Sequence, residues 1–326
     1  MKMPQRSKRE ELEAVQGPEG RVRCALTAPA ARPSGALPLA FLLLAGCVIG
    51  DNKYARPRDL TPTTFVERLR ILAIVAEPPE VAPGTPVTFT ALVADPQNDL
   101  PFKAWLACPP DQSGGSGCFV DLSQISPDAT PEELAALGVI GFEPGFAPTY
   151  TPDASLLDGL DDTARREGIN VTVELAAFPA ALMVQDPAEV DFNAVEVAYK
   201  RLVVSDASTP NHNPSFTEFT VDGMTVPDDA VVELDVGEYY EIGVVIPDDA
   251  IETYEYLNSE GVTEERTEEP YVDWYCTVPG LGEAYTLHPF TQADFVPEQA
   301  GDATCWAIAR DRRGGLAFRA QHFTIR

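Results

Sequence analysis

Only three histidines occur in this chain of 326 residues, and their spacing matches no catalytic motif. His212, His288 and His322 are far apart in the sequence, and none belongs to a metal-binding doublet or accompanies a nucleophile motif. The sequence also lacks a phosphate-cradling loop and a dinucleotide fingerprint. The histidines therefore indicate neither metal chemistry nor nucleophilic catalysis, and His212 is predicted to be a hydrogen-bonding loop residue.

Carboxylate pairs are the second candidate for chemistry, because two carboxylates can serve a glycosidase or a calcium site. Neighbouring carboxylates occur at Asp161-Asp162, Asp228-Asp229 and Asp248-Asp249. In a chain with 51 Asp and Glu residues such neighbours arise by chance, and glycoside hydrolysis needs separated carboxylates on different elements. We expect no enzymatic activity, no cofactor and no metal site, and an unrecognised hydrolase remains a distant alternative.

A short apolar run over residues 36–44 leads into the sequence Leu-Ala-Gly-Cys, which ends at Cys47. The run is too short to span a bilayer and has the length of a signal-peptide core. Leu-Ala-Gly-Cys resembles the bacterial lipobox, and this resemblance implies a diacylglyceryl group on the Cys47 sulfur and cleavage between Gly46 and Cys47. Two or three acyl chains hold a protein firmly on a membrane. We expect residues 1–46 to be a signal peptide and Cys47 to anchor the chain.

The leader is long for such a signal, and its first 21 residues carry charges of both signs. A start at Val22 would give an ordinary leader with Arg23 and Arg32 as its positive region. Val48 follows the cysteine where an inner-membrane retention signal would place aspartate, so the outer membrane is favoured over the inner membrane. Residues 47–68 are predicted to be the lipidated cysteine and a flexible, proline-containing tether.

Four further cysteines remain once Cys24 is assigned to the leader, and their compartment favours disulfides. Cys108 and Cys118 flank a glycine-rich turn, whereas Cys276 and Cys305 lie on expected neighbouring strands. We predict one disulfide within each pair, each contributing about 3 to 4 kcal/mol in the chain-entropy model. Zinc is the alternative ligand for four cysteines, but the chain has no Cys-x-x-Cys spacing.

Charge limits the partners of this chain. Asp and Glu outnumber Lys and Arg by 51 to 23. Such a surface repels phosphate backbones and anionic headgroups, which excludes nucleic acid and adsorption to membranes through basic patches. Membrane attachment must therefore come from the lipid on Cys47. The acidity suits solubility in a salty exterior, with divalent-cation binding as the alternative.

Short runs with period-two alternation predict strands over residues 69–75, 87–93, 102–108, 169–175 and 194–204. The third run contains Trp105, and a Pro-Gly turn separates the first two. An immunoglobulin-like sandwich has this order of strand, turn, Trp-bearing strand and closing strands. We expect a mainly β fold whose first immunoglobulin-like domain covers residues 69–207.

Residues 109–168 interrupt this pattern and are predicted to be a partly helical insertion. Thr130 is a suitable N-cap, proline follows it, and Glu133 stands at N3, so a helix is expected to start there.

Three aromatic residues of this insertion, Phe142, Phe146 and Tyr150, would give an aromatic-rich patch if exposed. Recognition usually falls to loops that rigid strands hold in place. We therefore take these three residues as the candidate partner surface. The alternative is that they cover an open sandwich edge or complete the core.

Residues 208–214 are rich in turn formers, so we place a domain boundary there and a second immunoglobulin-like domain over residues 208–326. Aligning Gly237 with Gly84 superimposes the apolar positions that follow them, which predicts that the second domain repeats the first. Residues 258–269 are acidic and lack periodicity, so they are predicted to be a solvated loop.

The whole layout resembles a class of myxobacterial-type lipoproteins. The shared features are a lipobox, a tether, a strand that runs into Glu-Pro-Pro-Glu-Val-Ala-Pro-Gly at residues 77–84, a Trp-Cys strand, and an Asn-Pro joint before a second sandwich. Only the lipobox and residues 77–84 are specific, and the class carries over no catalytic residues. We favour a membrane-anchored, non-catalytic binding or adhesion module that contacts an envelope protein or a surface ligand. A structural subunit of an envelope assembly is the alternative.

Overall fold

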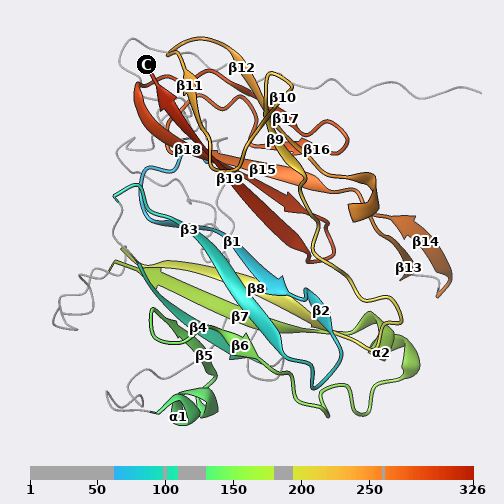
Figure 1. Ribbon diagram of the computed structural model, residues 1–326. Coiled ribbons are helices and arrows are strands. Elements are labelled where there is room, and N and C mark those ends of the chain that lie inside the picture. The colour runs from blue at the N-terminus through green and yellow to red at the C-terminus, as the bar shows by residue number, and fades with distance from the viewer. Residues whose placement is uncertain (1–61, 98–100, 109–129, 180–193, 259–260) are drawn as a thin grey trace, which may run out of the picture. The chain divides into compact units, whose positions relative to one another are not determined.

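The computed structural model describes residues 62–97, 101–108, 130–179, 194–258 and 261–326, and in these ranges the fold is mainly β (Figure 1). Residues Asp59–Arg326 form one compact unit. No helix in the described ranges is long and apolar enough to cross a membrane.

Two sheets enclose the first core. The smaller sheet has the order β1-β3-β6, with β1 (Arg70–Glu77), β3 (Val87–Ala94) and β6 (Thr149–Tyr150). The larger sheet has the order β2-β8-β7-β4-β5, with β2 (Glu80–Val81), β8 (Glu196–Val204), β7 (Ile169–Phe178), β4 (Phe102–Cys108) and β5 (Val139–Glu143). Trp105 is fully buried between the sheets beside Phe89 and Leu175. Alternate residues of β7 are buried, so the predicted period-two strand is confirmed.

A second pair of sheets encloses the second core. Its smaller sheet has the order β10-β9-β12-β17, with β10 (Met224–Val226), β9 (Glu218–Val221), β12 (Tyr240–Val245) and β17 (Gln292–Phe295). Its larger sheet has the order β11-β19-β18-β15-β16, with β11 (Val231–Leu234), β19 (Leu316–Ile325), β18 (Gly301–Arg310), β15 (Tyr271–Cys276) and β16 (Tyr285–Leu287). Trp274, Phe219 and Phe323 fill this core.

The two larger sheets have the same connectivity. β2 runs parallel to β8 in the first, and β11 runs parallel to β19 in the second. Each sheet then continues through antiparallel strands to a Trp-bearing strand, β4 or β15. Gly84 and Gly237 both adopt a positive φ, at 78° and 79°, just before β3 and β12. A glycine adopts this conformation without steric cost, which explains the residue type at both positions.

A third apolar cluster joins the two sheet pairs. Leu72 and Ala73 of β1 are buried together with Trp306 and Ile308 of β18. The cluster also contains Leu316 at the start of β19. Because these residues lie on the sheet faces that point away from the two main cores, the sheet pairs share buried apolar surface. This contact explains why residues Asp59–Arg326 form one unit.

Polar groups are buried beside this junction, within the segment in which we predicted a boundary. Asn211 is 1% exposed; its side chain donates to Asp311 at 2.7 Å and its backbone N–H donates to Glu80 at 2.8 Å. Lys200 donates to the backbone carbonyl of Gly314, and burial lowers the pKa of its ammonium to about 8. The segment is thus an ordered part of the fold, although its composition is that of a turn.

The end of the predicted tether is also ordered. Val66 is 1% exposed, its N–H donates to the carbonyl of Cys276, and the N–H of Cys276 donates to the carbonyl of Thr64. Residues 62–68 therefore depart from the expectation of a flexible tether, because this short stretch pairs beside β15 and buries its valine. The rest of the tether and the predicted signal peptide, including Gly46 and Cys47, lie outside the described residues.

Helix α1 (Pro131–Ala136) begins where the sequence predicts. Thr130 accepts from the backbone N–H of Glu133, and the Glu133 side chain accepts from the backbone N–H of Thr130, so the capping box is complete. A second helix, α2 (Asp162–Glu167), is capped by Asp161, which explains the first carboxylate pair as helix-start chemistry.

Part of the acidic segment predicted to be a solvated loop is a strand. β14 (Thr263–Thr267) pairs antiparallel with β13 (Thr253–Leu257), and every residue of β14 is exposed. A strand exposed on both faces needs no apolar alternation, so its sequence carries no period-two signal. A single 3-10 turn (Asp248–Ala250) precedes the hairpin and accounts for another carboxylate pair.

Candidate binding cleft

An open cleft of about 720 Å³ lies between β3, β4 and the turn after β5. β3 contributes Ala91 and Val93, and β4 contributes Phe102 and Lys103. The turn after β5 supplies the opposite wall, including Phe146. Most of this lining is apolar, which suits a binding cleft.

The cleft is open because β6 covers only the beginning of β3. β6 pairs with Val87 and Thr88, and the last contact along this edge is the N–H of Phe89, which donates to the carbonyl of Pro148 at 3.1 Å. Beyond Phe89 the chain of the predicted insertion leaves the edge of β3. The second half of β3 then forms the rim of the cleft.

A tight turn places Phe146 in the wall of the cleft. The backbone N–H groups of Gly145 and Phe146 donate to the carbonyl of Phe142 at 2.7 and 2.6 Å, and the N–H of Phe142 donates back to the carbonyl of Phe146 at 3.1 Å. Pro148 passes so close to Gly141 that a Cβ on residue 141 would lie 2.7 Å from it. Glycine at position 141 is therefore required for this path of the chain.

One ion pair stands in the cleft wall. The Lys103 ammonium lies 2.7 Å from the Glu143 carboxylate, and the indole N–H of Trp105 donates to the same carboxylate at 3.4 Å. Both charged side chains are about a quarter to a third exposed, at 23% and 31%. Water screens such a pair, so its contribution to stability is small. Its consequence is that the wall carries no net charge from these two groups.

The three aromatic residues of the predicted partner surface have different surroundings. Phe142 packs on Phe102 with ring centroids 5.8 Å apart, and Phe102 in turn stacks on Phe178 at 6.1 Å. Tyr150 lies on β6 and packs against the first core. Phe146 lines the main cleft and also a smaller cleft of about 440 Å³ beside Tyr150. The three residues therefore do not form one exposed aromatic patch, and Phe146 is the one that faces the main cleft.

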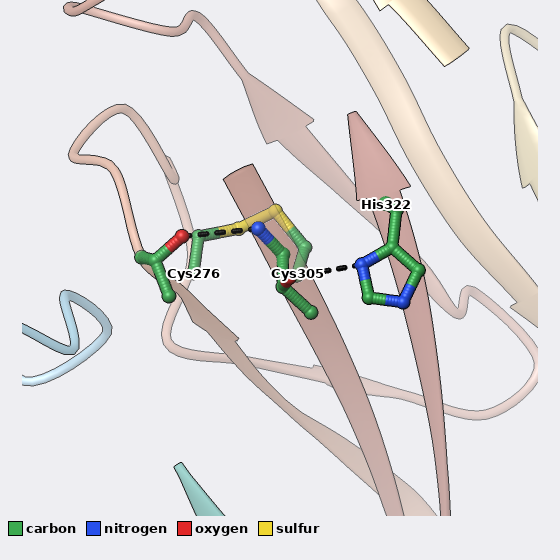
Figure 2. The surroundings of a disulfide bond; sticks show 5 residues. Cys276, Cys305 and His322 are labelled. Atoms are coloured by element: carbon green, nitrogen blue, oxygen red, sulfur yellow. Dashed lines mark hydrogen bonds between the residues drawn. A yellow bond between two sulfur atoms is a disulfide. The ribbon is translucent and has the colours of Figure 1, made fainter. Parts of the chain in front are cut away.

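The predicted disulfide between Cys276 and Cys305 is confirmed. These residues face each other on β15 and β18, and Figure 2 shows the bond between their sulfur atoms. Both cysteines are fully buried. In the same view His322 lies on the neighbouring strand, where its Nδ1 is 3.0 Å from the hydroxyl of Thr304. Cys108 is disulfide-bonded as well. Its predicted partner, Cys118, lies outside the described residues.

Other residues considered for chemistry make hydrogen bonds and ion pairs within the fold. His212 hydrogen-bonds Glu252 at 2.6 Å in a loop, which confirms the loop prediction. Glu252 itself binds Arg313, which also contacts Glu268 at 3.0 Å. Within the ranges that the structure describes, no three His, Cys, Asp or Glu side chains are arranged to hold a metal ion.

Sequence reasoning missed the residues that open the cleft. Ala91 and Val93 have the same apolar character as the core positions before them, so the sequence contains no signal that their strand edge is uncovered. The uncovered edge is seen only in the structure, in which the later segment first pairs with β3 at Pro148 and continues into β6.

Comparisons with known proteins give only remote similarities. No family model matches the chain, and no curated protein matches it. Among solved structures, the fibronectin(III)-like modules of Clostridium thermocellum CbhA align over 79% of this chain and 94% of theirs, with 11% identity and a TM-score of 0.23. The N-terminal Ig1-2 module of the Drosophila receptor protein tyrosine phosphatase DLAR aligns over 79% and 99%, with 13% identity and a TM-score of 0.25.

A marsupial T cell receptor aligns over 79% of this chain and 73% of its own chain, with 11% identity and a TM-score of 0.24. TM-scores this low do not establish a shared fold. The mainly β architecture rests instead on the sheets and cores of this chain.

Proposed function

We propose that this chain is a non-catalytic binding or adhesion module of the cell envelope. The observation that carries the proposal is the apolar cleft between β3 and the turn after β5, with Phe146 in its wall. Concave, mostly apolar sites are where proteins bind their ligands. Three of the residues that could do chemistry make structural contacts: Asp161 caps α2, His212 hydrogen-bonds Glu252, and Asp228 pairs with Arg319.

Two immunoglobulin-like domains in tandem, over residues 69–207 and 208–326, are part of this proposal. Its support is the repeated strand order of the two larger sheets and the matching positions of Trp105 and Trp274. The segment 109–168 is then an insertion into the first domain, and it supplies one wall of the cleft. In this arrangement the strands hold the recognition site rigid.

A position-specific crosslinking experiment tests the binding function. We expect a photo-crosslinking amino acid at position 146 to give a discrete partner adduct in cells that naturally make the protein. The same amino acid at position 285 is the matched control, because Tyr285 is an exposed aromatic residue outside the cleft. A yield at least about tenfold higher at position 146 supports the proposal. Equal adducts at both positions, or none at 146, would contradict it.

Anchoring through a lipid on Cys47 completes the proposed function, with the outer membrane as the favoured location. The support is the Leu-Ala-Gly-Cys sequence after a short apolar run. Cys47→Ser removes the thiol that would carry the diacylglyceryl group. We expect this variant to lose labelling by a fatty-acid analogue and to accumulate as a longer precursor. Labelling at the level of the unmodified protein would refute lipidation at this residue.

A further inference from the structure

The edge of β3 inside the cleft has backbone groups that no described strand pairs with. Within the described residues, the ladder between β3 and β6 ends at Thr88, and the hydrogen bond from Phe89 to Pro148 is the last one on that side. No hydrogen bond of the described chain reaches the N–H groups of Ala91 or Val93 from this side. In the part of the chain that the structure describes, the cleft is therefore bounded by a strand edge without a pairing strand, in addition to its apolar walls.

The direction of these groups follows from strand geometry. Along a strand, successive residues direct their N–H and C=O groups to opposite neighbours. The N–H of Phe89 points away from β1, because it donates to Pro148. Ala91 and Val93 follow at steps of two, so their N–H and C=O groups point the same way. Both residues line the cleft, so its rim offers two sets of backbone donors and acceptors.

From this geometry we infer that the cleft binds an extended segment of a partner protein, which adds as a strand beside β3 and continues the line that β6 begins. Backbone pairing with an exposed sheet edge gives such complexes their affinity, and pockets for alternate side chains give their specificity. This inference rests on the proposed binding function and specifies the conformation of what is bound.

The residues that line the cleft determine which side chains the bound segment can carry. A strand beside β3 directs every second side chain inward, between Val93 and Phe146. These inward residues are apolar and of moderate size, because the cleft of about 720 Å³ has to hold them together with the backbone. The Lys103–Glu143 pair leaves no free charge in this wall for a charged inward residue.

Charge favours a basic segment over an acidic one. Acidic residues outnumber basic ones by 51 to 23 in the whole chain, and Asp95 follows directly after β3 at the end of the open edge. The negative charge of the chain attracts a segment with Lys or Arg at its ends and repels an acidic segment. A second copy of this acidic chain is disfavoured for the same reason.

Synthetic peptides provide the test. The probe alternates Val and Thr and has Lys at both ends, and matched peptides carry Glu at the ends or N-methyl groups on every second residue. We expect the Lys-ended peptide to bind at least about tenfold more tightly than the Glu-ended one at low salt. N-methylation should abolish binding when it falls on the residues whose N–H groups face β3, and should spare binding when it falls on the other set.

A pair of protein variants tests the role of the strand edge. Ala91→Pro removes the outward N–H and leaves the ladder with β1 intact, since a proline is tolerated on an edge strand when its nitrogen faces outward. Ala91→Ser keeps the N–H and is the control. We expect the proline variant to lose at least about tenfold in affinity for the Lys-ended peptide while its thermal unfolding stays close to that of the serine variant.

Other outcomes separate this inference from the proposed function. Equal binding by the proline and serine variants, equal effects of the two methylation patterns, or no binding of the Lys-ended peptide would overturn strand addition. If the photo-crosslinking amino acid at position 146 still gave a specific partner adduct in cells, the proposed binding function would stand without strand addition. Concentration-dependent dimers that Ala91→Pro abolishes would show that a second copy occupies the edge, which also overturns the inference.

Discussion

Asp311→Ala is expected to destabilise the fold by about 3 to 5 kcal/mol, the cost of breaking a buried charged network by removing one partner. Asp311 is 2% exposed and accepts from the Asn211 side chain at 2.7 Å. Its other oxygen accepts from the backbone N–H groups of Arg313, Gly314 and Gly315 at 2.7, 2.9 and 2.9 Å. Alanine removes the acceptor of all four donors; those of Asn211 and Gly315 are buried, and those of Arg313 and Gly314 are part-buried. Each buried group left unsatisfied costs about 1 to 3 kcal/mol.

Two electrostatic effects change this cost in opposite directions. Burial raises the pKa of the Asp311 carboxyl, against the hydrogen bonds from Asn211 and the three backbone N–H groups, so removal of the carboxylate relieves part of a desolvation cost. The Asp311 charge in turn opposes the lowering of the Lys200 pKa, so the variant leaves a buried ammonium with one favourable interaction fewer.

Urea denaturation of the non-lipidated Cys47→Ser form measures this effect, with Asp302→Ala as the matched control. Asp302 is exposed, and the one described hydrogen bond of its carboxylate is accepted from the hydroxyl of Thr324 at 3.1 Å. We expect the control to change the free energy of unfolding by less than about 0.5 kcal/mol, as surface substitutions usually do. A loss below about 1 kcal/mol for Asp311→Ala would show that water satisfies these donors and that the junction is not tightly packed.

Local patterns predict the strands well because their signal depends only on burial of one face. The prediction for residues 102–108 coincides with β4, and residues 169–175 lie within β7. The capping box at Thr130 is equally local, since its two hydrogen bonds join residues three positions apart. These elements follow from the sequence because neighbouring residues alone determine them.

The junction and the cleft depend on residues far apart in the sequence. Asn211 and Asp311 are 100 positions apart, and nothing in a turn-rich segment shows that it pairs with a later loop. Ile308 on β18 packs against β1 instead of against its own core. The same limitation applies to Phe146, whose place in the cleft wall depends on where the chain leaves β3. Such features need the tertiary arrangement, which single-sequence patterns do not contain.

Trp274→Ala is the second substitution with a large expected effect, and it tests whether the two sheet pairs unfold together. Trp274 is fully buried, donates its indole N–H to Thr286 at 2.9 Å and contacts Phe219 edge to face at 6.2 Å. Truncation of a buried tryptophan costs about 3 to 5 kcal/mol. In a fold of this size, that loss corresponds to a melting temperature lower by about 10 °C.

The form of the melting curve shows whether the junction couples the two cores. Because Leu72, Trp306 and Ile308 share one buried cluster, we expect a single transition in calorimetry of the Cys47→Ser form, and Trp105→Ala in the first core should lower it as Trp274→Ala does. Phe290→Ala is the control, since Phe290 is 77% exposed and its truncation leaves no cavity. Two transitions, of which each tryptophan variant shifts only one, would show that the sheet pairs are thermodynamically independent and that the junction only tethers them.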